Sequence, residues 1–220
     1  MTPRAVLFDL DGTLSDPKTG SCLAMRHALE RLGVEPPPVE ALTWAIGPPM
    51  QDSMATLVGP ARAQAAVRFY RERYGTIGLF ENVLYEGVPD MLARLRQDGV
   101  SLYVATSKVE AFAQRIVDHF GIARFFRRVY GAQADGGLSN KDDLLAHILA
   151  REGAEAAGAI MVGDRVFDAR AARANGLRSV CARWGYGAPA EVAGAGFDAF
   201  AATPADVDAA RRSAGLKSGR

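Results

Sequence analysis

The chain has 220 residues, of which 49% are apolar and 23% charged, and its formal net charge is +1. This balance is typical of a globular protein, and it gives the molecule no overall attraction for a nucleic acid polymer or an acidic membrane. No apolar run approaches the ~18 residues of a membrane span. Cys22 and Cys181 lack metal-ligand spacing, so we expect a reduced, cytoplasmic protein.

Five short apolar runs alternate with longer helical patterns. Almost continuous apolar character is typical of strands covered on both faces, so the alternation predicts an α/β fold with a parallel, Rossmann-like sheet. Helix boundaries are marked by Pro89 and Gly99, by Gly121, and by Asn140 as an N-cap with Gly153 past the end. The expected strands are 5–8, 101–106, 128–132, 159–163 and 179–182.

The interval between the first and second strands is too long for a simple crossover. About 90 residues separate them, whereas a βαβ unit needs about 30. Helical patterns at 22–33, 50–58 and 61–75 fill the interval, and prolines punctuate them. We therefore expect a small helical cap domain at 17–83, inserted into a core domain formed by 1–16 and 84–220.

Two aspartates end the first strand. Asp9 and Asp11 lie at a carboxyl end, where parallel sheets bind ligands, and the period of two turns both to one side with Leu10 between them. Two carboxylates this close require a cation or a shared proton. Mg²⁺ suits the pair, because it takes one or two carboxylates and completes its shell with water and phosphate oxygens.

Other polar groups follow the later strands. Thr106 and Ser107 end the second strand, Asp164 ends the fourth, and Asp168 follows one helical turn later. Lys141 opens the helix between the third and fourth strands. Together these residues would bring three acidic positions, a hydroxyl and a lysine to one edge of the sheet, a set suited to a cation and a phosphoryl group.

These motifs resemble those of the haloacid dehalogenase superfamily. The segments "FDLDGTL", "VATS" and "VGDRVFDARAARANG", with Lys141, match its four motifs in order and spacing over about residues 5 to 205, and the helical insert is similar to its small cap domain. Within the superfamily the chain looks most like the phosphoglycolate phosphatase branch. The segments "GPPMQDS", "ENVLYEGVPDML" and "WGYG" also resemble bacterial 5′-nucleotidases of that branch.

The resemblance implies roles for the first motif. Asp9 would attack phosphorus and become an aspartyl phosphate, and Asp11 would protonate the leaving oxygen and then activate water. The Asp11 carbonyl would also bind Mg²⁺. Since a dehalogenase has no alkoxide to protonate and lacks aspartate at this position, Asp11 favours phosphoester chemistry.

The other motifs would complete the site. Asp164 would bind Mg²⁺, and Asp168 would hold metal-bound water or orient Lys141. Thr106 and Lys141 would hold the phosphoryl oxygens, with help from backbone N–H groups near Leu10 and Ser107.

The expected function is a Mg²⁺-dependent phosphatase for small soluble phosphomonoesters, with 2-phosphoglycolate and nucleoside 5′-monophosphates as first candidates. The alternatives are a phosphosugar mutase of the same fold and a non-enzymatic phosphoacceptor module that uses Asp9 as a switch. The inserted cap and the additional acid Asp11 argue against the phosphoacceptor module. Neither the particular ester nor the oligomeric state follows from the sequence.

Two positions depart from the family pattern. Asp142 follows Lys141 where proline is common, and we expect it to cap the helix rather than to change the local potential. Arg165 replaces a small hydroxyl residue, and is expected to face solvent more readily than to touch substrate. The polar ending 211–220 is expected to fray.

The insert carries two sets of candidates for contact with a leaving group. Its cations are more often surface charges than substrate contacts, and its aromatic residues more often pack in a core than stack on a base. The cations are Lys18, Arg26 and Arg73, and the aromatic residues are Trp44, Phe69, Tyr70 and Tyr74.

Overall fold

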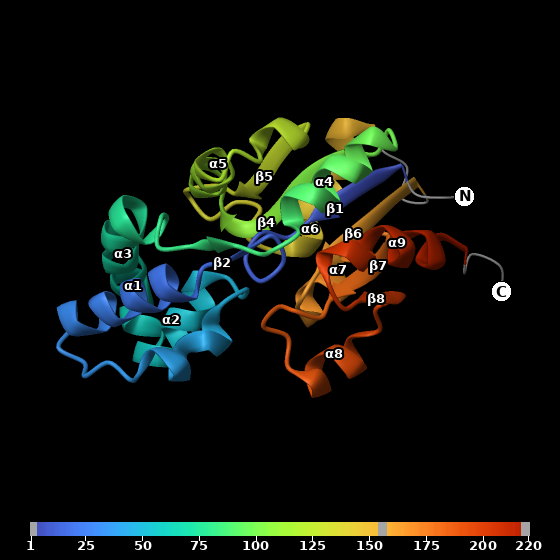
Figure 1. Ribbon diagram of the computed structural model, residues 1–220. Coiled ribbons are helices and arrows are strands. Elements are labelled where there is room, and N and C mark those ends of the chain that lie inside the picture. Colours follow the sequence, from blue (N-terminus) through green and yellow to red (C-terminus); the bar gives the residue numbers. More distant parts are fainter. Residues whose placement is uncertain (1–3, 154–157, 217–220) are drawn as a thin grey trace. The chain divides into compact units, whose positions relative to one another are not determined.

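The computed structural model describes residues 4–153 and 158–216 (Figure 1). The chain divides into two compact units, which we call the core unit and the insert unit. The core unit is Met1–Ser15 with Leu84–Arg220, and the insert unit is Asp16–Val83.

A six-stranded sheet forms the centre of the core unit, and every neighbouring pair in it is parallel. The predicted α/β fold with a parallel sheet is therefore confirmed. The strand order is β5-β4-β1-β6-β7-β8. The strands are β1 (Ala5–Phe8), β4 (Ser101–Val109), β5 (Arg128–Ala132), β6 (Ala159–Gly163), β7 (Arg178–Ala182) and β8 (Ala199–Ala201).

Helices cover both faces of this sheet. On one face, Leu7 of β1 and Met161 of β6 share a buried cluster with Leu144 of α6 and Ala171 of α7. The alternate residues, such as Val6 and Phe8, are fully buried on the other face, where α4 contacts β4 and α9 contacts β7. Core-unit helices are α4 (Val88–Gln97), α5 (Glu110–His119), α6 (Lys141–Glu152), α7 (Val166–Ala174), α8 (Pro189–Ala195) and α9 (Val207–Leu216). Short 3₁₀ turns lie at η3 (Ala123–Phe125) and η5 (Pro204–Asp206).

The insert unit is mainly helical. Its helices are α1 (Lys18–Arg31), α2 (Met50–Val58) and α3 (Pro60–Arg73), with a 3₁₀ turn η1 (Val39–Ala45) and a π-helical turn η2 (Tyr74–Gly78). Gly20 allows α1 to approach η2, since a Cβ there would meet the Gly78 carbonyl oxygen at 2.0 Å. Two-residue strands β2 (Ser15–Asp16) and β3 (Val83–Leu84) pair where the chain passes between the units.

Two features at the end of the chain differ from expectation. Strand β8 was not anticipated, because it is three residues long and Phe200 in its middle is half exposed at the sheet edge. The polar ending expected to fray is helical up to Leu216, because Arg211 is buried and ion-paired with Asp208. Residues 217–220 of that ending lie outside the described part.

Candidate active site

The candidate site lies where β1 and β6, adjacent in the sheet, both end. Asp9 follows Phe8 of β1, and Asp164 follows Gly163 of β6. The Asp9 N–H donates to the carbonyl of Val162, which keeps the two strand ends in register. After β5 the chain crosses to the far side of β1, so this edge is a topological switch point, the usual place for a ligand in such sheets.

Lys141 joins two of the acids. Its Nζ lies 3.0 Å from Asp9 Oδ2 and 2.5 Å from Asp168 Oδ1. All three side chains are at least nine-tenths buried. Asn140, the predicted N-cap, begins α6 directly before the lysine and accepts a hydrogen bond from the Asp142 N–H at 2.8 Å. The N-cap residue Asn140 thus fixes where α6 starts, and with it the position at which the Lys141 ammonium enters the site.

Burial and crowding shift the pKa values in this cluster. Burial raises the pKa of Asp9 to about 6, against the opposing effect of Lys141, and the charge of Asp168 adds to the rise. Burial also raises the pKa of Asp164 well above its usual range, with further contributions from Asp168 and Asp9. Burial disfavours the charge of Lys141, but Asp168 and Asp9 outweigh it and raise the pKa of Lys141. The acids repel one another strongly without a further cation.

The Asp164 carboxylate is fixed from two segments. Thr13 Oγ1 donates to its Oδ1 at 3.2 Å, and the Tyr186 N–H donates to its Oδ2 at 2.7 Å. Gly12 has φ +82°, and a Cβ there would lie 2.3 Å from Asp164 Oδ2. A Cβ on Gly185 would meet Asp164 equally closely. Gly185 and Tyr186 belong to the "WGYG" segment, whose resemblance to 5′-nucleotidases gave no sign of a contact with Asp164, because that contact depends on the tertiary structure.

The predicted phosphate-binding groups lie at the same edge. Thr106 is buried in β4, two residues beyond Val104, which pairs with Phe8 of β1. Ser107 follows it and is partly buried. The Leu10 N–H donates to Asp9 Oδ1 at 2.8 Å, so it is engaged with the nucleophile candidate itself.

Asp11 has a partner that sequence reasoning missed. Lys108 Nζ lies 2.8 Å from Asp11 Oδ2, and their side chains are 8% and 15% exposed. Lys108 stands two residues after Thr106 in β4, so the period of two along a strand was the signal that could have found it. The lysine brings a second ammonium to the site.

The two departures from the family pattern occupy other positions than expected. Arg165 does not face solvent: it is the N-cap residue of α7, 9% exposed, and its Nε pairs with Glu191 at 2.9 Å. Its N–H donates to Asp168 Oδ2. Asp142 does not cap α6, since Asn140 does, and its carboxylate lies 3.4 Å from Arg170.

Of the aromatic residues of the insert unit, two pack in its core. Tyr70 and Tyr74 are buried and stacked, with ring centroids 5.0 Å apart. Phe69 lies under the guanidinium of Arg31. Trp44 is 42% exposed.

The candidate cations of the insert unit all have partners within that unit. Arg73 binds Glu81 through two hydrogen bonds of 2.7 and 2.9 Å. Arg26 donates to the Pro37 carbonyl, and Lys18 lies 3.7 Å from Glu40.

The acids at the strand ends fit a divalent cation. Carboxylate oxygens of Asp9, Asp164 and Asp168 lie within 4.8 Å of one another, and all three residues are buried. Asp168 uses one oxygen for Lys141 and the other for the Arg165 N–H. Asp9 and Asp164 are therefore better placed as metal ligands, and hard oxygen donors of this kind suit Mg²⁺.

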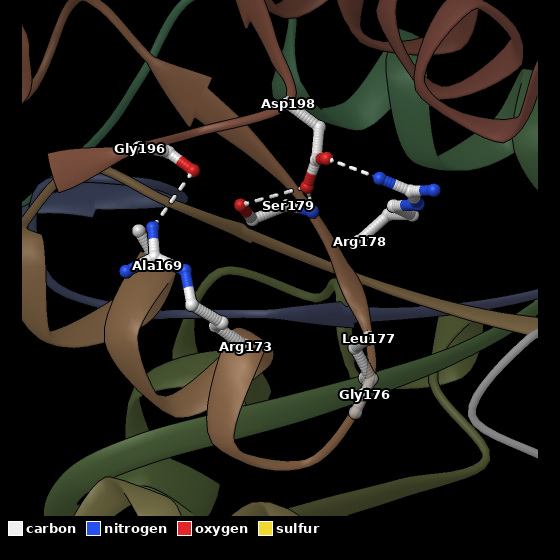
Figure 2. Close-up of a pocket in the computed structure, with 8 residues that line it drawn as sticks. All are labelled: Ala169, Arg173, Gly176, Leu177, Arg178, Ser179, Gly196 and Asp198. Atoms are coloured by element: carbon white, nitrogen blue, oxygen red, sulfur yellow. Dashed lines mark hydrogen bonds and ion pairs between the residues drawn. The ribbon is translucent and has the colours of Figure 1, made fainter. Parts of the chain in front are cut away.

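A hollow lies at the opposite end of the strands from these acids, where β7 begins (Figure 2). There Arg178 pairs with Asp198 at 2.8 Å, and Arg173 donates to the Gly196 carbonyl. Ser179 also donates to Asp198. These polar groups satisfy one another, and the hollow contains none of the predicted site residues.

The sequence and this site together define a protein family. The family model of haloacid dehalogenase-like hydrolases matches residues 6–182, and the chain belongs to that family. It is 41% identical over 189 residues to a 5′-nucleotidase of Pseudomonas aeruginosa, a match covering 85% of this chain and 86% of that protein. A phosphoglycolate phosphatase of Pseudomonas fluorescens is 30% identical over 193 residues, covering 84% and 71%. The predicted enzyme class, a phosphatase of this family, is confirmed.

Two further relatives bear on the chemistry. The chain is 41% identical over 186 residues to the tyrosine-protein kinase PtkA of Mycobacterium tuberculosis, covering 84% of this chain but only 64% of that longer protein. Among solved structures, a predicted phosphatase from Clostridium acetobutylicum matches with a TM-score of 0.92 and 31% identity, covering 95% of this chain and 98% of that one.

Within residues 4–153 and 158–216, no helix has the length and apolar character to cross a membrane.

Proposed function

We propose that the protein hydrolyses small phosphomonoesters in two steps through an aspartyl phosphate on Asp9. The observation that carries the proposal is the placement of Asp9 at the switch point, with the Lys141 ammonium 3.0 Å from its Oδ2. A carboxylate beside a fixed cation can attack a phosphoryl group whose charge that cation partly neutralises.

In the first step, the Asp9 carboxylate attacks phosphorus as the bond from phosphorus to the ester oxygen breaks. Asp11 donates a proton to the leaving oxygen, which departs as an alcohol. Lys141 and Thr106 hold the phosphoryl oxygens, with the Ser107 N–H. Asp168, bonded to Lys141 at 2.5 Å, keeps the ammonium in position.

In the second step, Asp11 takes a proton from a water molecule, which attacks the phosphorus of the aspartyl phosphate. The bond from phosphorus to Asp9 breaks, so that the Asp9 carboxylate and inorganic phosphate are released. The same aspartate therefore serves first as acid and then as base.

We propose that Asp9, Asp164 and the backbone carbonyl of Asp11 bind Mg²⁺. When bound, the cation would neutralise the crowded acids and the charge of the phosphoryl group. The raised pKa values of Asp9 and Asp164 support this assignment, because two buried carboxylates are otherwise poorly compensated.

The substrates we favour are nucleoside 5′-monophosphates and 2-phosphoglycolate. The names of the Pseudomonas relatives support these two classes. We propose that residues 17–83 act as a cap that selects the leaving group. PtkA is named a protein kinase, so transfer of the phosphoryl group to a tyrosine is the second candidate. A phosphosugar mutase and a non-enzymatic phosphoacceptor module remain alternatives, and in both of them Asp9 would accept the phosphoryl group.

Phosphate release tests these candidates against one another. We expect wild-type protein with Mg²⁺ to release phosphate steadily from a panel of phosphomonoesters, EDTA to stop the release, and Asp9→Asn to abolish it. Interconversion of sugar monophosphates that depends on an added sugar bisphosphate, without steady phosphate release, would indicate the mutase. Single labelling of Asp9 without turnover would indicate the module, and transfer from ATP to a tyrosine peptide without phosphomonoester hydrolysis would indicate the kinase.

A further inference from the structure

The Asp11 carboxylate is held by one oxygen and left open at the other. Lys108 binds Oδ2 at 2.8 Å, whereas Oδ1 is buried and accepts no hydrogen bond within the described residues. Ser15 forms a β-bridge with Asp11, but its buried hydroxyl also has no hydrogen-bond partner among the residues that the structure describes. Within the described parts of the chain, Lys108 is therefore the side chain that fixes this carboxylate.

Lys108 is itself held firmly. It lies in β4, its side chain is 8% exposed, and its N–H donates to Thr106 Oγ1 at 3.3 Å. The strand that presents Thr106 to the phosphoryl group therefore also presents the ammonium to Asp11. A buried oxygen without a partner is costly unless a ligand or water completes it.

We propose that Lys108 is a positioning residue for Asp11. By holding Oδ2, it orients the carboxylate so that Oδ1 exchanges the proton with the leaving oxygen and later with water. The inference rests on the proposed function, because it assigns the carboxylate oxygen that acts in that reaction. An acid that is misplaced by about 1 Å loses much of its effect.

The leaving group provides the test. A nucleoside leaves as a strongly basic alkoxide and needs the proton, whereas p-nitrophenol leaves as a weakly basic phenoxide and hardly does. Both esters carry the same phosphoryl dianion and an uncharged remainder. Loss of a cation that only binds the phosphoryl group would therefore weigh equally on both, and the ratio of their kcat/KM values reports how Lys108 supports the acid–base function of Asp11.

We expect Lys108→Met to lower kcat/KM for a nucleoside 5′-monophosphate by about 10- to 100-fold, a part of the usual ~10²–10⁴-fold contribution of acid–base catalysis. For p-nitrophenyl phosphate the loss should be about threefold or less. Lys108→Arg, which keeps the charge, should recover part of the ratio. Arg212→Met, which removes an exposed cation paired with Asp98, should leave both values unchanged.

Equal losses for both esters in a folded Lys108→Met protein, checked by its thermal unfolding, would overturn the positioning role and indicate a cation that binds phosphate. If Lys108→Met does not fold, a larger loss for the nucleotide than for p-nitrophenyl phosphate in a Lys108→Arg protein of normal stability supports the role, and equal losses or no loss in that variant overturn it. If the wild-type protein releases phosphate from no ester, the proposed function fails first, and the role of Lys108 with it.

Discussion

The Nζ of Lys141 lies 2.5 Å from Oδ1 of Asp168, although 27 residues separate the two in the chain. The contact joins the first residue of α6 to the first turn of α7. Both residues are buried, and Asp9 shares the same ammonium. One lysine thus neutralises two buried acids.

Removal of that lysine should destabilise the protein strongly. Lys141→Met leaves buried carboxylates without a cation, and breaking a buried ion pair costs about 3–5 kcal/mol. We expect a loss of this order in urea unfolding of EDTA-treated protein, and a smaller loss with Mg²⁺. As the control, Arg170→Met breaks an exposed pair with Asp142 and should change stability by less than about 1 kcal/mol. Similar losses for the two variants would contradict the arrangement.

Single substitutions should distinguish the roles of Asp9 and Asp11. Asp9→Asn removes the nucleophile, so no ester should react. Asp11→Asn keeps the nucleophile, so p-nitrophenyl phosphate should still phosphorylate Asp9, but water is no longer activated. Rapid-quench measurements should then show a burst of nitrophenol with phosphate retained on the protein. On a nucleotide, the same variant should lose about 10²–10⁴-fold in rate. A variant Asp11→Asn without a burst would show that the roles are assigned wrongly.

The raised pKa values of Asp9 and Asp164 predict how stability depends on pH. The pKa of Asp9 is about 6 in the folded protein and 3.8 as its ordinary value, so between these pH values the folded state binds more protons than the unfolded state. The contribution of Asp9 to the stability of the metal-free protein is therefore fully present below about pH 4, and it is lost as the pH rises through 6.

A bound metal should reverse this trend, because the ligands must lose their protons to bind it. We expect the rise in Tm caused by Mg²⁺, measured against EDTA by thermal unfolding, to be larger at pH 7.5 than at pH 5. An equal rise at both pH values would argue against Asp9 and Asp164 as ligands.

Gly12 should be essential to the position of Asp164. Gly12→Ala places a Cβ 2.3 Å from Asp164 Oδ2 at φ +82°, whereas Gly99→Ala at φ +75° meets nothing within 4 Å. Both variants should lose about 1 kcal/mol for the left-handed backbone. Only Gly12→Ala should also weaken Mg²⁺ binding and activity, by tenfold or more, as measured by Mg²⁺ titration of phosphate release. If both variants titrate alike, Asp164 is not the residue that the glycine accommodates.

Local patterns in the sequence were enough to predict the five long strands, the helices between them and the placement of Asp9 and Asp164 at strand ends. Such patterns depend on the period of two, on caps such as Asn140 and on glycines, all of which act over a few residues. The order of motifs along the chain likewise predicted Lys141 as a member of the site.

Only the tertiary structure decided which side chains pair across the fold. The contacts of Lys108 with Asp11 and of Arg165 with Glu191 join residues that are far apart in the chain, and the Tyr186 N–H reaches Asp164 through a loop. These contacts depend on the strand order and register, which bring the carboxyl ends of β1, β4 and β6 to one edge. Strand β8 is three residues long, and it needs the neighbouring β7 to form at all, since a strand has no hydrogen bonds within itself.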